Sequence, residues 1–244
     1  MAIADQIRPY WDVDAATYDD APNHRPTSPA ERAAWDAALA RLLPPPPARV
    51  LDCGAGTGFL SMIAARMGHL VTALDVSSEM LDRLRKRAAV AGVGIEIVQG
   101  PADQPPPGPF DAVMERHLLW TLPDPTAALR RWREVAPDGR LVLVEGVWGQ
   151  VDALEVLRAR GRKLVRTWRK RPDDHHGHYD PDVTSALPFG RGTAPSSVVD
   201  AARSAGWPYA WLERLRDVEW AATVDLPLPE RLLGVPARFV VTAG

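Results

Sequence analysis

The sequence holds a single cysteine, Cys53, among its 244 residues. One cysteine excludes an internal disulfide and a cysteine-rich metal site. The sequence also lacks any run of 18 or more apolar residues, so no membrane span is expected. Its first residues have neither the basic nor the apolar region of a secretory signal peptide, which favours a soluble cytoplasmic protein.

An excess of charge of one sign is missing too. The formal net charge is -2 at pH 7, which disfavours a partner held by electrostatic attraction, such as nucleic acid or a membrane surface. A hydrophobic content of 46% is enough for a large core. A chain of this length suits one α/β domain with additions, acting on a small molecule as monomer or dimer.

A glycine-rich turn stands at the centre of the pattern. An apolar run ends in Asp52, and Gly54, Gly56 and Gly58 follow before a helical pattern begins at about Phe59. This order predicts a strand, a tight turn and a helix start, where an open α/β sheet builds its ligand crevice. Glycines let the backbone approach a ligand closely, and the helix N-terminus offers unpaired N–H groups.

The spacing of the glycines in the turn narrows the class of ligand that the turn could bind. The glycines read G-x-G-x-G, whereas the dinucleotide fingerprint needs a sixth-position glycine where Phe59 stands. A phosphate-binding loop would need a lysine, and none is present in this stretch. The Asp52 carboxylate could accept hydrogen bonds from the amino group of a cationic ligand or from the N–H groups of the turn. A plain strand-turn-helix without a ligand is the alternative.

Strands and helices alternate along the rest of the chain. This alternation predicts a mostly parallel sheet with helices on both faces and a closing antiparallel hairpin. Strands are expected at residues 49–53, 70–74, 95–98, 110–114, 141–145, 209–220 and 236–242. We divide the single domain into a helical cap (1–43), a ligand-binding core (48–146), a helix and loop that cover the substrate (151–195), and a last helix and hairpin (196–244).

An acid closes the second strand. Asp75 follows the apolar residues 70–74, and a carboxylate at this position can accept hydrogen bonds from two ribose hydroxyls. The alternative is a helix cap, but Ser77 and Ser78 are better placed to cap the next helix. Val76 and Met80 lie beside this acid, and a methionine there could pack on a purine or in the core.

Residues 52–58 resemble the first motif of the class I S-adenosylmethionine (SAM)-dependent methyltransferases. A second segment agrees: Arg116, His117 and Trp120 precede Leu-Pro-Asp-Pro, which is similar to the fourth-strand region of small-molecule methyltransferases of types 11 and 25. The resemblance implies a Rossmann-like sheet of order 3-2-1-4-5-7-6. It also implies methyl transfer from SAM, with S-adenosyl-L-homocysteine as product, to an N- or O-nucleophile of a small molecule, for which a biosynthetic pathway of specialised metabolism is the expected setting.

The resemblance also implies roles for particular residues. Residues at the turn would hold the methionine end of the cofactor, the acid after the second strand the ribose, and the turn after the third strand the adenine. Pro101 has no N–H to donate, so the adenine contact would shift to the next two residues. The cofactor-binding set is Tyr18, Asp52, Gly54, Ala55, Gly56, Gly58, Asp75, Val76, Met80, Pro101, Ala102, Asp103 and Arg116.

Catalysis would come mainly from alignment of the nucleophile with the methyl group. His117 could act as a general base, because the unperturbed pKa of histidine lies near neutrality; a histidine satisfied by local backbone is the alternative. Tyr18 is a second candidate at the reacting centre, or a packing residue of the cap. The residues expected to bind the substrate are Trp120, Trp148, His178 and Tyr179.

Two charged segments leave choices open. Residues 173–180 contain three histidines and three acids, but their contiguous spacing does not aim ligands at one point, so we expect no metal and favour a substrate-covering segment. The basic stretch 158–171 is interpreted as a solvated helix face, with nucleic-acid binding as the alternative. The rival functions are a nicotinamide-dependent oxidoreductase, a non-catalytic SAM binder and an RNA methyltransferase.

Overall fold

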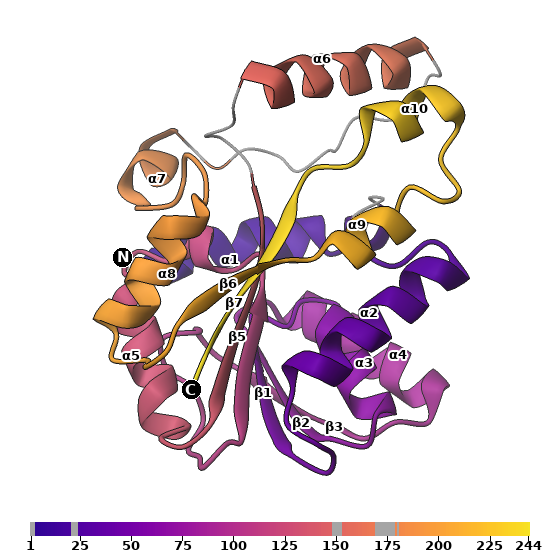
Figure 1. The fold of residues 1–244 in the computed structure, drawn as a ribbon. Helices are drawn as coiled ribbons and strands as arrows, with labels where there is room; N and C mark the ends of the chain where they lie inside the picture. The colour runs from indigo at the N-terminus through magenta and orange to yellow at the C-terminus, as the bar shows by residue number, and fades with distance from the viewer. Residues whose placement is uncertain (1–2, 21–23, 148–152, 169–178, 180) are drawn as a thin grey trace.

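The computed structural model describes residues 3–20, 24–147, 153–168, 179 and 181–244. In this part of the chain one seven-stranded sheet has the order β3-β2-β1-β4-β5-β7-β6 (Figure 1). The neighbouring strands pair in parallel except β7, which is antiparallel to both β5 and β6. The expected fold class, strand order and antiparallel last strand are confirmed. The strands are β1 Arg49–Cys53, β2 Leu70–Asp75, β3 Ile95–Gln99, β4 Ala112–Arg116, β5 Arg140–Gly146, β6 Trp211–Arg214 and β7 Arg238–Ala243.

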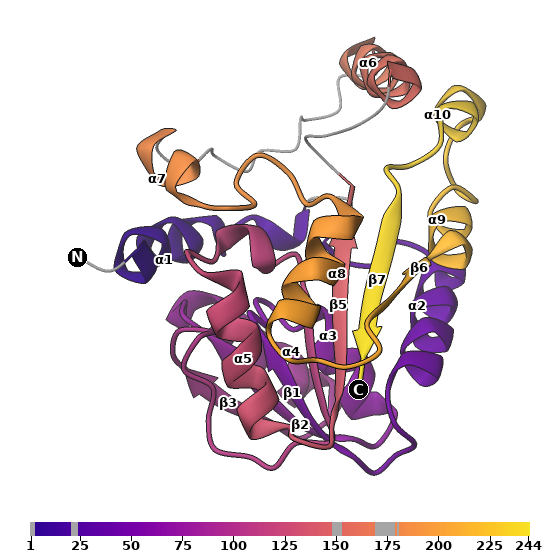
Figure 2. The same cartoon turned by 60° about the vertical axis from the view of Figure 1, so that its left-hand side comes forward.

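Helices cover both faces of the sheet (Figures 1 and 2). One face carries α2 (Pro29–Leu42), α3 (Phe59–Arg66) and α4 (Ser78–Ala91), and the other carries α5 (Pro125–Val135) and α8 (Pro195–Ser204). Central strands buried on both sides need nearly continuous apolar sequence, which is the pattern of β1, β4 and β5. The hydrophobic core therefore has two parts, one on each face of the sheet. Trp35 of α2 is buried in one part, and Trp132 of α5 and Trp207, which follows α8, are buried in the other.

The helix starts follow local capping chemistry. The Ser28 hydroxyl accepts the Glu31 N–H at 3.1 Å, and proline follows at the first position of α2, as the sequence predicts. The Ser77 hydroxyl likewise accepts the Met80 N–H at 3.2 Å at the start of α4. Ser77 thus takes the capping role, which leaves the carboxylate before it available for another partner.

Further helices lie beyond the carboxyl ends of the parallel strands (Figures 1 and 2). Helix α1 (Ile3–Asp14) and the short helix η1 (Tyr18–Asp20) cross that end and reach α4. Helix α6 (Ala153–Trp168) packs against α10 (Leu228–Leu233), and α7 (Pro181–Ala186) precedes α8. Among the described residues, no helix is long and apolar enough to cross a membrane.

Several boundaries differ from the prediction. The strand expected at 209–220 is only Trp211–Arg214, and helix α9 (Arg216–Ala221) follows because it buries Val218 in the core and Glu219 against Arg214. Strand β4 begins two residues later than expected and runs on to Arg116, and β7 begins at Arg238, two residues later than expected.

The cap of α5 is Asp124. The Asp124 carboxylate accepts the Ala127 N–H at 2.8 Å, and Pro125 occupies the first helical position. Before α5 lies a second short helix, η2 (Leu119–Thr121), which the sequence pattern did not predict. It turns the chain at the edge where the ends of β1, β2 and β4 meet.

Candidate functional site

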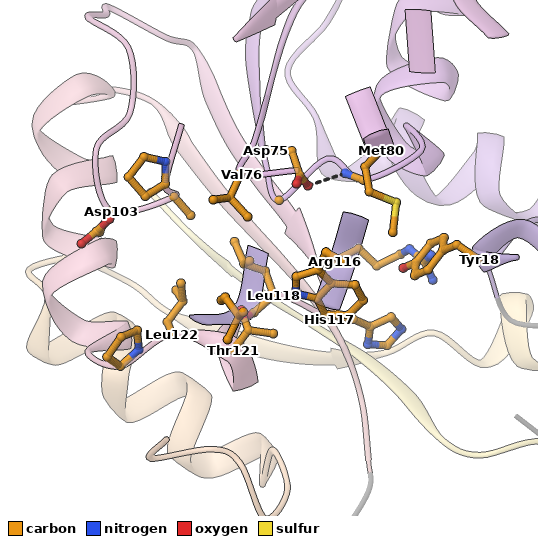
Figure 3. A pocket seen from close by; sticks show the side chains of 17 residues that line it. Tyr18, Asp75, Val76, Met80, Asp103, Arg116, His117, Leu118, Thr121 and Leu122 are labelled. Atoms are coloured by element: carbon orange, nitrogen blue, oxygen red, sulfur yellow. Dashed lines mark hydrogen bonds between the residues drawn. The ribbon is translucent and has the colours of Figure 1, made fainter. Parts of the chain in front are cut away.

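A cavity lies at the carboxyl ends of β1, β2 and β4 (Figure 3). It encloses about 960 Å³, open solvent at its mouth included, and a smaller cavity of about 280 Å³ adjoins it. Its walls come from α1, η1, the glycine turn after β1, the end of β2, the turn after β3 and the segment after β4. These are the places at which the sequence analysis expects a ligand.

The glycine turn has backbone angles and close packing contacts that a residue with a side chain would disturb. Gly54 and Gly58 have φ angles of +64° and +85°, in the left-handed region. A Cβ atom on Gly58 would lie 2.2 Å from Leu84 Cδ1, and one on Gly54 would lie 2.7 Å from Leu118 Cδ1. The turn therefore needs glycine both for its backbone angles and for its packing on α4 and on the segment after β4.

Asp75 holds the turn in place from the end of β2. Its Oδ2 accepts the Gly56 N–H at 2.7 Å (dashed in Figure 3), and its Oδ1 accepts the Ser77 N–H at 2.9 Å. Burial raises the pKa of Asp75, and the backbone hydrogen bonds oppose that shift. An ionised carboxylate has about four acceptor positions, so both oxygens keep lone pairs for hydroxyl donors in the cavity.

Asp52 faces a different partner from the one expected. Its Oδ2 accepts both the N–H of Ser61, at 3.0 Å, and the hydroxyl of Ser61, at 2.5 Å, so it ties β1 to α3 and not to the N–H groups of the turn. Burial raises the pKa of Asp52 to about 7. Asp52 lines the smaller cavity together with Gly54, Gly56 and Arg116. A cationic group in that cavity would meet this carboxyl group.

The far end of the larger cavity is formed by Pro101, Ala102 and Asp103, as the sequence predicts. The indole Nε1 of Trp132 donates to the Ala102 carbonyl at 2.7 Å and fixes this turn. Val76 also lines the cavity (Figure 3). An apolar wall with a fixed backbone turn suits a flat, weakly polar ring.

Arg116 stands at the near end, where the two cavities meet. Its guanidinium carbon lies 4.0 Å from the centre of the Phe59 ring, and burial lowers its pKa. Phe59, which replaces the glycine of a dinucleotide fingerprint, thus supports a cation at the site. Tyr18, on η1, lines both cavities beside Arg116, and its ring packs on His24 at 3.9 Å between centroids.

His117 follows Arg116 and lines the larger cavity (Figure 3). Its φ angle is +59°, an uncommon value for a residue with a side chain. Its Nδ1 lies 3.4 Å from Glu145 Oε2, and Glu145 is fully buried at the end of β5. Burial raises the pKa of Glu145 to about 8. Glu115, fully buried on β4, also has a raised pKa because of burial and of the charge of Glu145.

Neither Glu115 nor Glu145 was predicted from the sequence to lie at the site. A signal was present, because each acid follows an apolar run that forms a central strand. An acid at the end of such a strand must be buried or must face the ligand edge. The same signal placed Asp75 at the ligand edge, and Asp75 lines the cavity.

An aromatic cluster covers the cavity on the side of α1. Trp11 lines the cavity and was not predicted to do so. Trp120 and Tyr179, which were predicted to bind substrate, do not line it; they pack together at 5.1 Å and each lies 6.2 Å from Trp11 between ring centroids. They support Trp11, and their direct contact with a substrate stays a prediction.

Two other predicted substrate residues, Trp148 and His178, lie outside the described residues. So does most of the segment 173–180. Among the residues that the structure describes, no group of three or more histidine, cysteine, aspartate or glutamate side chains could hold a metal ion. The choice between substrate and metal for residues 173–180 stays open.

Polar contacts fasten the cap to the glycine turn. The Thr57 hydroxyl donates to Asp19 Oδ1 at 2.7 Å, and Arg87 donates to the Thr57 carbonyl at 2.8 Å. The Ser77 hydroxyl donates to Asp12 Oδ1 at 2.6 Å. Arg87 therefore connects α4 to the turn and the cap.

Residues 51–143 match a family model described as a methyltransferase domain. The matched stretch contains β1 to β5 up to Leu143, with the glycine turn, Asp75 and His117. The resemblance drawn from the glycine turn is confirmed.

Curated relatives match part of the chain. The ubiquinone biosynthesis O-methyltransferase of Xanthomonas euvesicatoria is 40% identical over 100 residues, 39% of this chain and 42% of that protein. The protein-L-isoaspartate O-methyltransferase of Methylorubrum extorquens is 35% identical over 116 residues, 47% of this chain and 48% of that protein. The chain thus spans less than half the length of these curated relatives.

Solved structures extend the likeness in fold to nearly the whole chain. The magnesium protoporphyrin IX methyltransferase of Synechocystis, solved with S-adenosylhomocysteine (SAH), has a TM-score of 0.62 at 16% identity and covers 99% of both chains. A complex named DhpI–SAH has a TM-score of 0.60 at 20% identity and covers 99% of this chain and 96% of that one. The fold of this chain is therefore similar to that of these proteins along nearly its whole length.

Proposed function

We propose that this protein transfers a methyl group from SAM to a small-molecule acceptor. The observation that carries the proposal is the order of groups along the cavity: Arg116 at one end, the Asp75 carboxylate in the middle and the Pro101–Asp103 turn at the other. The Arg116 cation, a hydroxyl acceptor and a flat apolar wall match the methionine carboxylate, the ribose and the adenine of SAM in sequence. Relatives named as O-methyltransferases and a fold shared with SAH complexes support this reading.

The residues present fit this cofactor. Asp52 and the glycine turn would hold the methionine end, and Asp75 would accept from the ribose hydroxyls. Ala102 and Asp103 would contact the adenine, with Val76 and Met80 packing beside it. Bound SAM supplies a methyl carbon on a positively charged sulfur, and the C–S bond breaks with its electron pair kept by sulfur as the acceptor attacks.

The acceptor would enter at the Arg116 end, beneath the cap. Trp11 and Tyr18 line that end and offer aromatic surface, which suits an apolar or aromatic small molecule. His117 lines the same end and is the group that could take a proton from the attacking atom. The curated relatives support oxygen as the attacking atom.

Calorimetric titration of the purified protein with SAM, SAH and NAD tests the proposal. We expect binding of SAM and SAH at micromolar concentration and no binding of NAD. Binding of NAD alone would support an oxidoreductase and overturn the proposal. A screen of hydroxylated and amino acceptors with radiolabelled SAM follows; SAM binding with no transfer to any acceptor would indicate a non-catalytic SAM binder, and transfer to RNA would indicate the nucleic-acid alternative.

A further inference from the structure

Helix α6 presents an exposed apolar stripe. Leu157, Leu164 and Trp168 are 65%, 72% and 80% exposed, and their spacing along the helix places them on one face. A single exposed leucine is common on a protein surface, but tryptophan is mostly buried in folded proteins. An exposed tryptophan in line with two exposed leucines therefore indicates an interaction surface.

Helix α10 lies beside α6 and holds it. A Cβ atom on Gly161 of α6 would lie 2.9 Å from Leu233 Cδ2, so the two helices are in close contact. The Arg162 guanidinium also donates to the Leu233 carbonyl at 3.2 Å. Helix α10 itself exposes Leu228 and Leu232, which are four residues apart and so share a face. Both helices of the pair therefore expose large apolar side chains.

The charges of α6 are mostly positive. Of its residues five are basic and one, Glu155, is acidic, whereas the whole chain has 29 basic and 31 acidic residues. Glu155 forms ion pairs with Arg158, at 3.9 Å, and with Arg162. Arg160 and Lys163 are exposed and lie beside the apolar stripe. The net charge of -2 thus describes the whole chain, while α6 has a local excess of positive charge.

The position of α6 leaves it accessible to a flat partner. Figures 1 and 2 both show α6 as the outermost of the described elements beyond the carboxyl ends of the parallel strands, with α10 next to it. The cavity lies at the same end of the sheet. A planar surface can therefore contact α6 without meeting the strands or the helices that cover them.

We propose that α6, supported by α10, binds the surface of a membrane that contains anionic lipids. Leu157, Leu164 and Trp168 insert at the boundary between headgroups and acyl chains, and the helix lies in the plane of the bilayer. Arg160 and Lys163 meet the lipid phosphates, since long basic side chains reach headgroups while their stems cover apolar surface. Leucine and tryptophan on one face with basic residues beside them are the pattern of an interfacial helix.

Other partners suit this surface less well. A two-fold dimer through α6 would bring the basic residues of two copies together, and like charges repel. A nucleic acid would pair with the cations but leave the leucines in water, and Trp168 is the one aromatic residue of α6 on which a base could stack. An anionic lipid surface satisfies both the apolar stripe and the cations.

The first test measures sedimentation of the whole protein with lipid vesicles, in the absence of SAM. Vesicles of phosphatidylcholine alone are compared with vesicles of equal parts phosphatidylcholine and phosphatidylglycerol. We expect a partition coefficient at least about tenfold higher for the anionic vesicles, because each cation near such a surface contributes a factor of about five. The difference should shrink as salt is added. Equal partitioning onto both vesicles, or onto neither, would overturn the proposal.

Two double variants test whether α6 is the contact. Leu164→Ser with Trp168→Ser should lower the partition coefficient at least about tenfold, because two inserted apolar groups are lost. Arg160→Gln with Lys163→Gln should lower it about 25-fold on the anionic vesicles. These four side chains are exposed, so the fold should be retained, which circular dichroism checks. Wild-type partitioning in either folded variant would overturn the proposal.

Matched controls lie elsewhere on the molecule. Trp211→Ser removes another exposed tryptophan, but Trp211 begins β6 at the opposite end of the sheet, since β6 runs parallel to β5. Arg130→Gln with Arg131→Gln removes two exposed cations from α5. Both controls should partition as the wild type does. A loss as large as that of the α6 variants would mean unspecific attraction and would overturn the proposal.

This surface and the proposed function fail in different measurements. Vesicle binding needs neither cofactor nor acceptor, and the Kd for SAM should be the same in the wild type and in both α6 variants. Absence of SAM binding by the wild type would defeat the proposed function and leave the vesicle result unaffected. Salt-dependent binding of single-stranded RNA, lost on Arg160→Gln with Lys163→Gln and without any vesicle binding, would assign α6 to nucleic acid and overturn the proposal.

Discussion

The two ends of the cavity are built in different ways. The end that would hold the nucleoside uses a carboxylate at the end of β2 and the turn after β3, which Trp132 fixes. The end that would hold the acceptor uses side chains from distant parts of the chain, with Tyr18 from the cap, His117 after β4 and Glu145 from β5. Backbone geometry fixes the first end, and buried charge fixes the second.

This difference teaches where each kind of function resides. A ligand shared by a whole family can be held by backbone groups and a few local side chains, so its site leaves a mark in the sequence. A reacting centre depends on ionisation states, and these are set by burial and by neighbours that only the fold brings together. Variants at the two ends should therefore fail in different measurements.

The largest expected effect is at the acceptor end. Replacement of His117 by alanine should lower kcat about 100-fold to 10,000-fold, because a general base contributes roughly that factor. The Kd for SAM, measured by calorimetry, should stay within about twofold. Full turnover near neutral pH in this variant would remove His117 from the reaction.

The matching change at the nucleoside end is Asp75→Ala. Each hydrogen bond to a charged group contributes about 1.5–3 kcal/mol, and Asp75 also fixes Gly56, so the Kd for SAM should rise about 100-fold. The control Asp82→Asn removes an exposed carboxylate on α4 that pairs only locally with Arg85. Calorimetry that gives the same affinity for both variants would exclude Asp75 from the ribose role.

The turn itself can be broken through its packing. Gly58→Ala places a Cβ atom 2.2 Å from Leu84 and strains the backbone, so the free energy of unfolding should fall by about 2–4 kcal/mol in urea denaturation. Gly68→Ala is the control, since its φ is +91° but no atom lies within 4 Å of the added Cβ. The smaller loss of unfolding free energy expected for Gly68→Ala measures the backbone strain by itself. Equal losses in the two variants would show that the contact with Leu84 has no energetic cost.

The buried Asp52 gives the fold a pH dependence. Its folded-state pKa is raised from 3.8 to about 7, so the folded state binds the proton more tightly than the unfolded state does. Its stabilising effect is present below pH 4 and is lost as pH rises through 7. Relative to Asp52→Asn, the wild type should therefore lose free energy of unfolding between pH 4 and 7; parallel pH curves for the two proteins would contradict this.

The smallest expected effect concerns the fastening of the cap. Asp19→Asn weakens the contact with Thr57 and the 3.6 Å ion pair with Arg87, both partly exposed. Such pairs contribute about 0–1 kcal/mol, so the Kd for SAM should rise only about twofold to threefold. A change as large as that of Asp75→Ala would mean that the cap, and not the turn, dominates cofactor binding.

Much of the core could be predicted because its signals are local. The strand ends at Asp75 and the glycine turn follow from residue order, and parallel pairing then places them at one edge of the sheet. The boundary between β6 and α9, within Trp211–Ala221, could not be predicted, because the alternation of apolar and polar residues continues past the residue at which α9 begins. Trp11 was missed because nothing in the helix that carries it shows that the helix crosses the cavity.

The sequence by itself determined the class of fold, the strand order through its family resemblance, and the residues after β2 and β3 that line the cavity. Those features depend on glycine geometry, strand periodicity and the acids that end strands. Only the tertiary structure decided that Asp52 binds Ser61, that Phe59 supports Arg116 and that Glu145 reaches His117. The physical reason is that burial and pairing between strands are properties of the packed sheet, and no short stretch of the chain contains them.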